Sequence, residues 1–72
     1  MNVQAAYFLE INREELEILA LVAEGLTNKE IATKLLISKK AVKDTLTQVY
    51  EKLDVEKKQQ AIEKAKVLSL IY

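Results

Sequence analysis

The 72 residues of this chain allow one domain with a thin hydrophobic core, and its charged side chains balance to a formal net charge of zero. The composition contains no cysteine and no histidine, which excludes disulfides and thiolate metal sites and removes the usual general base. Because it also lacks a signal peptide and the about 20 apolar residues that span a membrane, we expect a soluble cytoplasmic protein that is not an enzyme and carries no metal or cofactor.

The remaining composition favours an all-α fold, since alanine, leucine, glutamate and lysine are abundant and proline is absent. We expect four helices in residues 11–72 and a linker or an extra half-helix in residues 1–10. The first helix begins after Asn12, where Glu15 completes a capping box, and ends at a left-handed Gly25. Its apolar stripe recurs at helical spacing and comprises Leu16, Ile18, Leu19, Ala20, Val22 and Ala23.

Two helices follow in quick succession. Thr27 caps the second one, with Glu30 closing another capping box, and this helix ends near Leu36. Ser38 then offers the cap of a third helix from about Lys39 to residue 53. The inner face of the second helix comprises Ile31, Ala32 and Leu35.

The third helix is clearly two-sided. Four apolar residues fall within about 60° of one another on a helical projection, and they are Val42, Leu46, Val49 and Leu53. The opposite side carries Lys40, Lys43, Asp44, Thr47 and Glu51. We therefore expect one side of this helix in the core and the other free.

A fourth helix is expected from about Lys57 to Leu70, with an inner seam of Ala61, Ile62, Ala65 and Leu68. A second face of this helix carries Gln60, Glu63, Val67 and Ile71. Its apolar members either cover the first helix or the N-terminal segment, or they form a two-fold dimer contact.

The charge is unevenly distributed along the chain. One arginine and five acids give the first 26 residues a net charge of −4, whereas five lysines and two acids give residues 27–47 a net charge of +3. A polyanion responds to the local potential within about a Debye length, so the second and third helices form the candidate surface for nucleic acid.

The second and third helices fit a helix-turn-helix. Ala32 is small enough for the helices to cross closely, and Val42 stands ten residues later, where an apolar side chain packs beneath the second helix. The cap at Ser38 leaves backbone N–H groups at the start of the third helix, where a phosphate can dock.

Three segments carry a resemblance to a known family, namely "EGLTNKEIATKLLISKKAVKDTL", "VYEKLDV" and "QAI". Over about residues 11–70 the chain resembles the LuxR/NarL/FixJ-type DNA-binding domain of bacterial transcription regulators. The resemblance implies a four-helix helix-turn-helix bundle for residues 11–72, with the third helix in the major groove of double-stranded DNA. It also implies that the fourth helix supports a homodimer, at least on DNA. We also consider RNA polymerase as a further partner.

The DNA-binding residues that the resemblance implies are Thr27, Lys29, Ser38, Lys39, Lys40, Lys43, Asp44 and Thr47. Lys29 and Lys39 lie near helix starts and should contact the DNA backbone rather than bases. Each of these residues also has a purely structural interpretation. The lysines can form a solvated helix surface, and Thr27 and Ser38 can serve only as caps. Asp44 can pair with Lys40, one turn earlier, or with a lysine from elsewhere.

The sequence also departs from the family at several positions. Ala41 stands where the family has threonine, and Asp54 stands where it has the glycine that ends the third helix in a left-handed turn. Asp44 places a carboxylate on the side that faces the groove, where it repels phosphates but can accept from a cytosine amino group. Two hypotheses follow, a sequence-specific DNA-binding domain of a transcription regulator, or a protein-interaction module that kept the fold and lost DNA.

Overall fold

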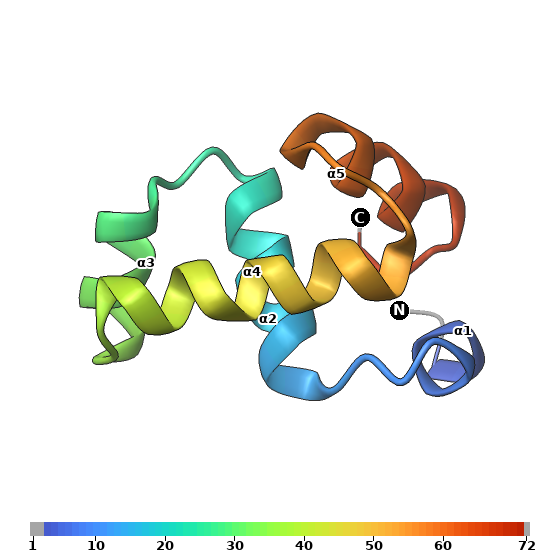
Figure 1. Ribbon diagram of the computed structural model, residues 1–72, viewed down its shortest axis with the longest axis horizontal. Coiled ribbons are helices and arrows are strands. Elements are labelled where there is room, and N and C mark those ends of the chain that lie inside the picture. Colours follow the sequence, from blue (N-terminus) through green and yellow to red (C-terminus); the bar gives the residue numbers. More distant parts are fainter. Residues whose placement is uncertain (1–2, 72) are drawn as a thin grey trace.

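The computed structural model describes residues 3–71, and five helices lie within this range (Figure 1). They are α1 (Val3–Phe8), α2 (Arg13–Ala23), α3 (Asn28–Leu35), α4 (Lys39–Leu53) and α5 (Lys58–Val67). The four expected helices are α2 to α5, and α1 occupies the segment expected as a linker or a half-helix. None of the five is long and apolar enough to cross a bilayer.

Helix α4 runs along the longest axis of a molecule that measures 29 × 20 × 20 Å. Figure 1 shows α3 at the beginning of α4, and α1 and α5 near its end. Helix α2 packs against α4 between them. The arrangement leaves one side of α4 uncovered along the length of the helix, because its neighbours lie on the side that carries the apolar seam.

The expected helix starts are confirmed by their hydrogen bonds. The Asn12 side chain accepts from the Glu15 N–H at 2.8 Å, and the Glu15 carboxylate accepts from the Asn12 N–H at 2.9 Å. Thr27 and Glu30 form the same reciprocal pair at the start of α3. Ser38 Oγ accepts from the Ala41 N–H at 2.9 Å, so each cap satisfies a donor that the first turn of its helix leaves unpaired.

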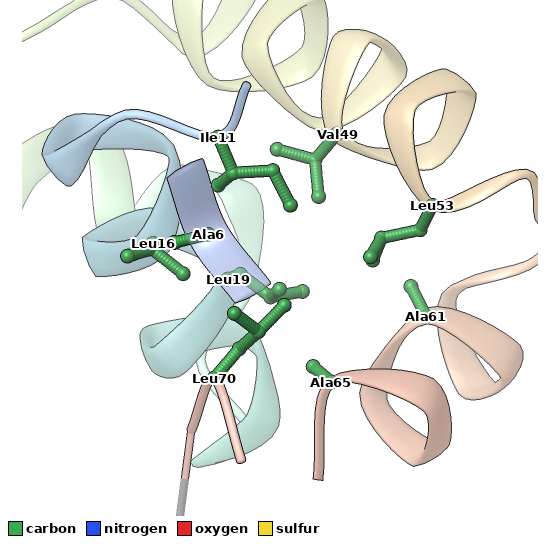
Figure 2. Packing of buried hydrophobic residues seen from close by; sticks show 9 residues of the cluster. All are labelled: Ala6, Ile11, Leu16, Leu19, Val49, Leu53, Ala61, Ala65 and Leu70. Atoms are coloured by element: carbon green, nitrogen blue, oxygen red, sulfur yellow. The ribbon is translucent and has the colours of Figure 1, made fainter. Parts of the chain in front are cut away.

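The core consists of two clusters that share α2 and α4. The first cluster lies around the second half of α4, and Figure 2 shows its side chains converging from α1, α2, α4 and α5. Its buried members are Ala6, Ile11, Leu16, Leu19, Val49, Leu53, Ala61, Ala65 and Leu70. Because α1 contributes Ala6 and the following turn contributes Ile11, the segment from α1 to Ile11 packs into this part of the core through these two side chains.

The second cluster joins the helix-turn-helix to α2. Its buried members are Ile18, Leu21, Val22, Ile31, Ala32, Val42 and Leu46. The first half of the α4 seam therefore packs against α3, and the second half packs against α5. This confirms the inward orientation of the four seam residues, which are each at most 5 % exposed. Burial of the seam fixes the rotation of α4 about its axis and thereby decides which side chains face solvent.

Each helix is followed by a residue in the left-handed conformation. These residues are Glu10, Gly25, Leu36, Asp54 and Ser69, with φ values between 57° and 97°. The next residue is apolar in every case and donates its N–H back into the preceding helix, as Ile11 does to the Ala6 carbonyl at 2.8 Å. Asp54 thus keeps the left-handed stop although it lacks the conformational freedom of glycine.

Leu36 offers a direct test of the cost of these turns, because its side chain is 91 % exposed while φ is 58°. Replacing Leu36 with glycine should raise the free energy of unfolding by about 0.5 to 1 kcal/mol, since glycine avoids the clash that an L-residue meets there. Thr33→Gly, in the right-handed interior of α3, is the control and should lower the free energy of unfolding by about 0.5 kcal/mol. Urea unfolding monitored by circular dichroism measures both, and a destabilised Leu36→Gly variant would contradict the argument.

Helix α5 is shorter than expected, since it ends at Val67 and not at Leu70. Ser69 adopts φ 59°, its N–H bonds to the Lys66 carbonyl, and the Leu70 N–H bonds to the Ala65 carbonyl at 2.8 Å. This closure turns Leu70 back into the first core cluster, where it is 2 % exposed. Burial of that side chain stabilises this turn by about 2 kcal/mol.

Candidate nucleic-acid interface

The uncovered side of α4 presents the polar residues that the sequence places opposite the seam. Lys40, Lys43, Asp44 and Thr47 are all exposed, and none of them packs against the body of the molecule. Side chains at these spacings lie within two turns of one another on a helix surface. They form a contiguous polar face, which we call the α4 face and define by these four residues.

Two side-chain hydrogen bonds form on the α4 face. The Lys40 ammonium lies 3.0 Å from an Asp44 carboxylate oxygen, and the two side chains are 83 % and 56 % exposed. The hydroxyl of Thr47 donates to the Lys43 carbonyl at 3.0 Å, one turn earlier. The pairing of Asp44 with Lys40 is thus confirmed, and Lys43 is the cation of the face that forms no ion pair within residues 3–71.

The start of α4 adds a site that suits an anion. Ser38 and Lys39 are both exposed there, and the first N–H groups of a helix have no partner within it. The positive end of the helix dipole points in the same direction. A phosphate placed at this end would meet backbone donors and a lysine together.

Thr27 and Lys29 are exposed as well, but they lie at the beginning of α3. Figure 1 shows that the other end of α3 is the one beside the start of α4. The two ends of an eight-residue helix are about 12 Å apart. Thr27 and Lys29 therefore lie at the end of α3 that is remote from the start of α4.

Two ionisable groups near this region have shifted pKa values. The Thr27 backbone N–H and side chain hydrogen-bond to the Glu30 carboxylate and lower the pKa of Glu30. Burial raises the pKa of the Tyr50 phenol, which packs against both core clusters. Both groups keep their ordinary charge at neutral pH, so the charge of the region comes from the exposed lysines, Glu30 and Asp44.

Comparison with known proteins agrees with this geometry. Residues 11–65 match the family described as bacterial regulatory proteins of the luxR family. That match covers α2, α3 and α4 and most of α5. The chain belongs to the luxR family. It is a helix-turn-helix DNA-binding domain of transcription regulation and not an enzyme.

Two curated relatives illustrate the similarity of this luxR-family domain. It is 51% identical over 51 residues to the transcriptional regulatory protein LiaR of Bacillus subtilis, covering 71% of this chain and 24% of the relative. It is 43% identical over 58 residues to the oxygen regulatory protein NreC of Staphylococcus carnosus, covering 81% of this chain and 27% of the relative. The chain thus spans about a quarter of the length of these relatives.

The expected dimer residues of the luxR-family domain are not brought together on one helix face. Gln60, Glu63 and Val67 lie on α5 and are exposed, Val67 to 82 %. Ile71 lies beyond the end of α5, so the helical spacing that related it to Val67 does not apply. It is half-buried and lies beside Ala20 of α2. Ile71 therefore covers the first expected helix, whereas Val67 remains free.

Sequence reasoning missed two features of the luxR-family domain. Gln48 is exposed one turn after Asp44, and continuing the i, i+4 spacing from Asp44 would have identified it as a further candidate for base contact. Lys52 Nζ lies 2.8 and 2.9 Å from the carboxylate oxygens of Glu15 and donates to the Glu10 carbonyl at 2.8 Å. Glu15 is only 2 % exposed, and no local pattern reveals a pair that is 37 residues apart.

Proposed function

We propose that this luxR-family domain binds duplex DNA sequence-specifically by inserting α4 into the major groove. The observation that carries the proposal is the α4 face, whose polar side chains are exposed while the apolar seam on the opposite side anchors the helix. In this arrangement Lys40 and Lys43 contact phosphates, and Asp44 and Thr47 lie near base edges.

Further backbone contacts come from the helix starts. Ser38 and Lys39 would hold a phosphate at the beginning of α4, where the helix dipole is positive. Thr27 and Lys29 would contact a more distant phosphate from the beginning of α3, because α3 separates them from α4. Such contacts position the domain on the duplex without reading its sequence.

The proposed assembly on DNA is a homodimer formed through α5. Support comes from Val67, an apolar side chain that is 82 % exposed, and from Gln60 and Glu63 on the same side of the helix. Ile71 would contribute only through the exposed part of its side chain. A two-fold axis would place two copies of α4 about one DNA turn apart, so that each operator contains two half-sites.

The proposal extends to the cell. A domain that regulates transcription from bacterial DNA works in the cytoplasm. RNA polymerase is the proposed further partner, which the domain would contact from its site on the DNA. Residues 11–72 would form the DNA-binding unit, with residues 1–10 as an N-terminal extension that packs on it through α1.

Selection of bound duplexes from a random pool tests the proposal. We expect the pool to converge on two half-sites separated by about 10 base pairs. Binding should weaken between about 50 and about 200 mM salt, with about two to four phosphate contacts per protomer, each adding about 0.9 to the salt slope. Retention of no duplex even at low salt would overturn DNA binding by this domain.

One observation favours a second candidate function. The Lys40–Asp44 pair neutralises part of the charge on the α4 face, and the whole chain has no net charge. A protein-interaction module that uses the same fold without DNA would have these properties. The selection separates the two functions, because such a module would enrich no sequence.

A further inference from the structure

The Lys40–Asp44 pair raises the question of what a carboxylate does on a surface that faces DNA. Asp44 lies on the exposed side of α4, one turn after Lys40, and its carboxylate is held 3.0 Å from the ammonium group. An unpaired carboxylate would be repelled by phosphates. The pairing with Lys40 offsets this repulsion and also restricts the rotamers of the aspartate.

The ammonium group of Lys40 can serve two acceptors at once. It has three N–H donors, of which the bond to Asp44 uses one. Lys40 also stands nearer to the start of α4, where a phosphate is expected to dock. Lys40 can therefore bridge a phosphate and Asp44, so that docking on the DNA backbone also aims the carboxylate at the floor of the groove.

A carboxylate at a base edge selects among the four bases by its chemistry. Ionised aspartate has acceptors and no donor. Guanine and thymine present acceptors in the major groove, which face the carboxylate unfavourably. Adenine presents an amino donor beside the N7 acceptor, so its edge suits a side chain with both a donor and an acceptor. Cytosine presents an amino donor and no acceptor on its own major-groove edge.

We propose that Asp44 reads a cytosine in each half-site, accepting a hydrogen bond from the N4 amino group while Lys40 holds the carboxylate in place. The inference rests on the proposed insertion of α4 into the major groove, and it specifies one of the bases that α4 recognises there. Asp44 is thus a specificity-determining residue. A favourable contact of this kind discriminates against other bases by about tenfold.

Three parallel selections from one random duplex pool test the inference. The unchanged chain should enrich cytosine at one position of each half-site. Asp44→Ala should lose the preference at that position and keep the preferences at the other positions. Asp44→Asn should shift the same position to adenine, because an amide can pair with both N6 and N7. Asp44 is exposed, so none of these changes disturbs the core.

Glu17→Ala serves as the matched control. Glu17 is an exposed acid on α2, so the substitution removes the same charge away from the α4 face and should leave the cytosine preference unchanged. Identical base preferences for the unchanged chain and Asp44→Ala would overturn the role of Asp44 and leave DNA binding standing. Failure of the unchanged chain to retain any duplex would instead overturn the proposed function itself, so the two failures are distinct.

Discussion

Lys43→Glu is expected to lower the affinity of the domain for its selected duplex by about tenfold or more per protomer. Lys43 is the cation of the α4 face that forms no ion pair within the described residues, so its ammonium group is free to bind a phosphate. Loss of a charge-assisted hydrogen bond costs about 1.5 kcal/mol, which corresponds to about tenfold in affinity. The glutamate adds repulsion, and two protomers on one operator multiply the loss.

Salt dependence gives this prediction a second readout. Each lost phosphate contact should reduce the slope of log affinity against log salt by about 0.9, so a dimer should lose about 1.8. Fluorescence anisotropy with a labelled duplex at several salt concentrations measures both quantities. The base preferences of the variant should stay unchanged, because a phosphate contact carries no sequence information.

Lys58→Glu is the matched control, since it reverses the same charge at an exposed position at the start of α5. We expect its affinity to change by much less than tenfold. Equal losses for the two variants would show that only overall charge matters, and an unaffected Lys43→Glu variant would remove Lys43 from the interface. Circular dichroism should show both variants folded, because neither side chain is part of the core.

Lys52→Met is expected to lower the free energy of unfolding by about 3 kcal/mol. The change leaves the Glu15 carboxylate, which is 2 % exposed, without the ammonium group that lies 2.8 Å away. Removing one partner of a buried ion pair typically costs about 3 to 5 kcal/mol, because an uncompensated charge stays behind. A domain of this length is stable by only about 4 to 10 kcal/mol, so the loss is a large fraction of the total.

The structural consequence should extend to the ends of two helices. Lys52 ties α4 to the start of α2 through Glu15 and to the end of α1 through the Glu10 carbonyl. Hydrogen exchange of the α1 amides should therefore become faster than in the unchanged chain. Urea unfolding gives the free energy, and a loss below about 1 kcal/mol would show that the pair contributes no more than a surface ion pair.

The double variant Glu15→Gln with Lys52→Met separates charge from packing. Glutamine keeps an oxygen that can accept from the Asn12 N–H, as the carboxylate does at 2.9 Å, but it carries no charge. We expect the double variant to recover more than half of the stability lost by Lys52→Met, because pairs replaced together often cost little. Lys58→Met, at an exposed position, is the control and should stay within about 0.5 kcal/mol of the unchanged chain.

The helix starts and the inward face of α4 were predictable because their determinants are local. The Asn12–Glu15 and Thr27–Glu30 capping boxes each join residues three positions apart, and their sequence pattern implies their hydrogen bonds. The seam from Val42 to Leu53 follows from helical periodicity alone. These local features also placed the α4 face correctly on the exposed side.

The end of α5 was not predictable on the same grounds. Residues 57–70 continue a helical pattern, and no glycine or proline marks a stop. The helix ends at Val67 because Ser69 adopts a left-handed conformation that lets Leu70 enter the core. That outcome depends on the apolar side chains of α1, α2 and α4 against which Leu70 packs, and the local sequence of α5 does not describe them.

The sequence by itself determined the all-helical class, the presence of four helices and the residues that α4 directs inward and outward, since hydrogen bonds and periodicity within four residues decide them. Only the tertiary structure decided that α1 joins the core, that two clusters divide the α4 seam, and that Lys52 is tied to Glu15. Those features arise from contacts between residues far apart in the chain. Their energies depend on which helices become neighbours, and a pattern read along one helix contains no information about its neighbours.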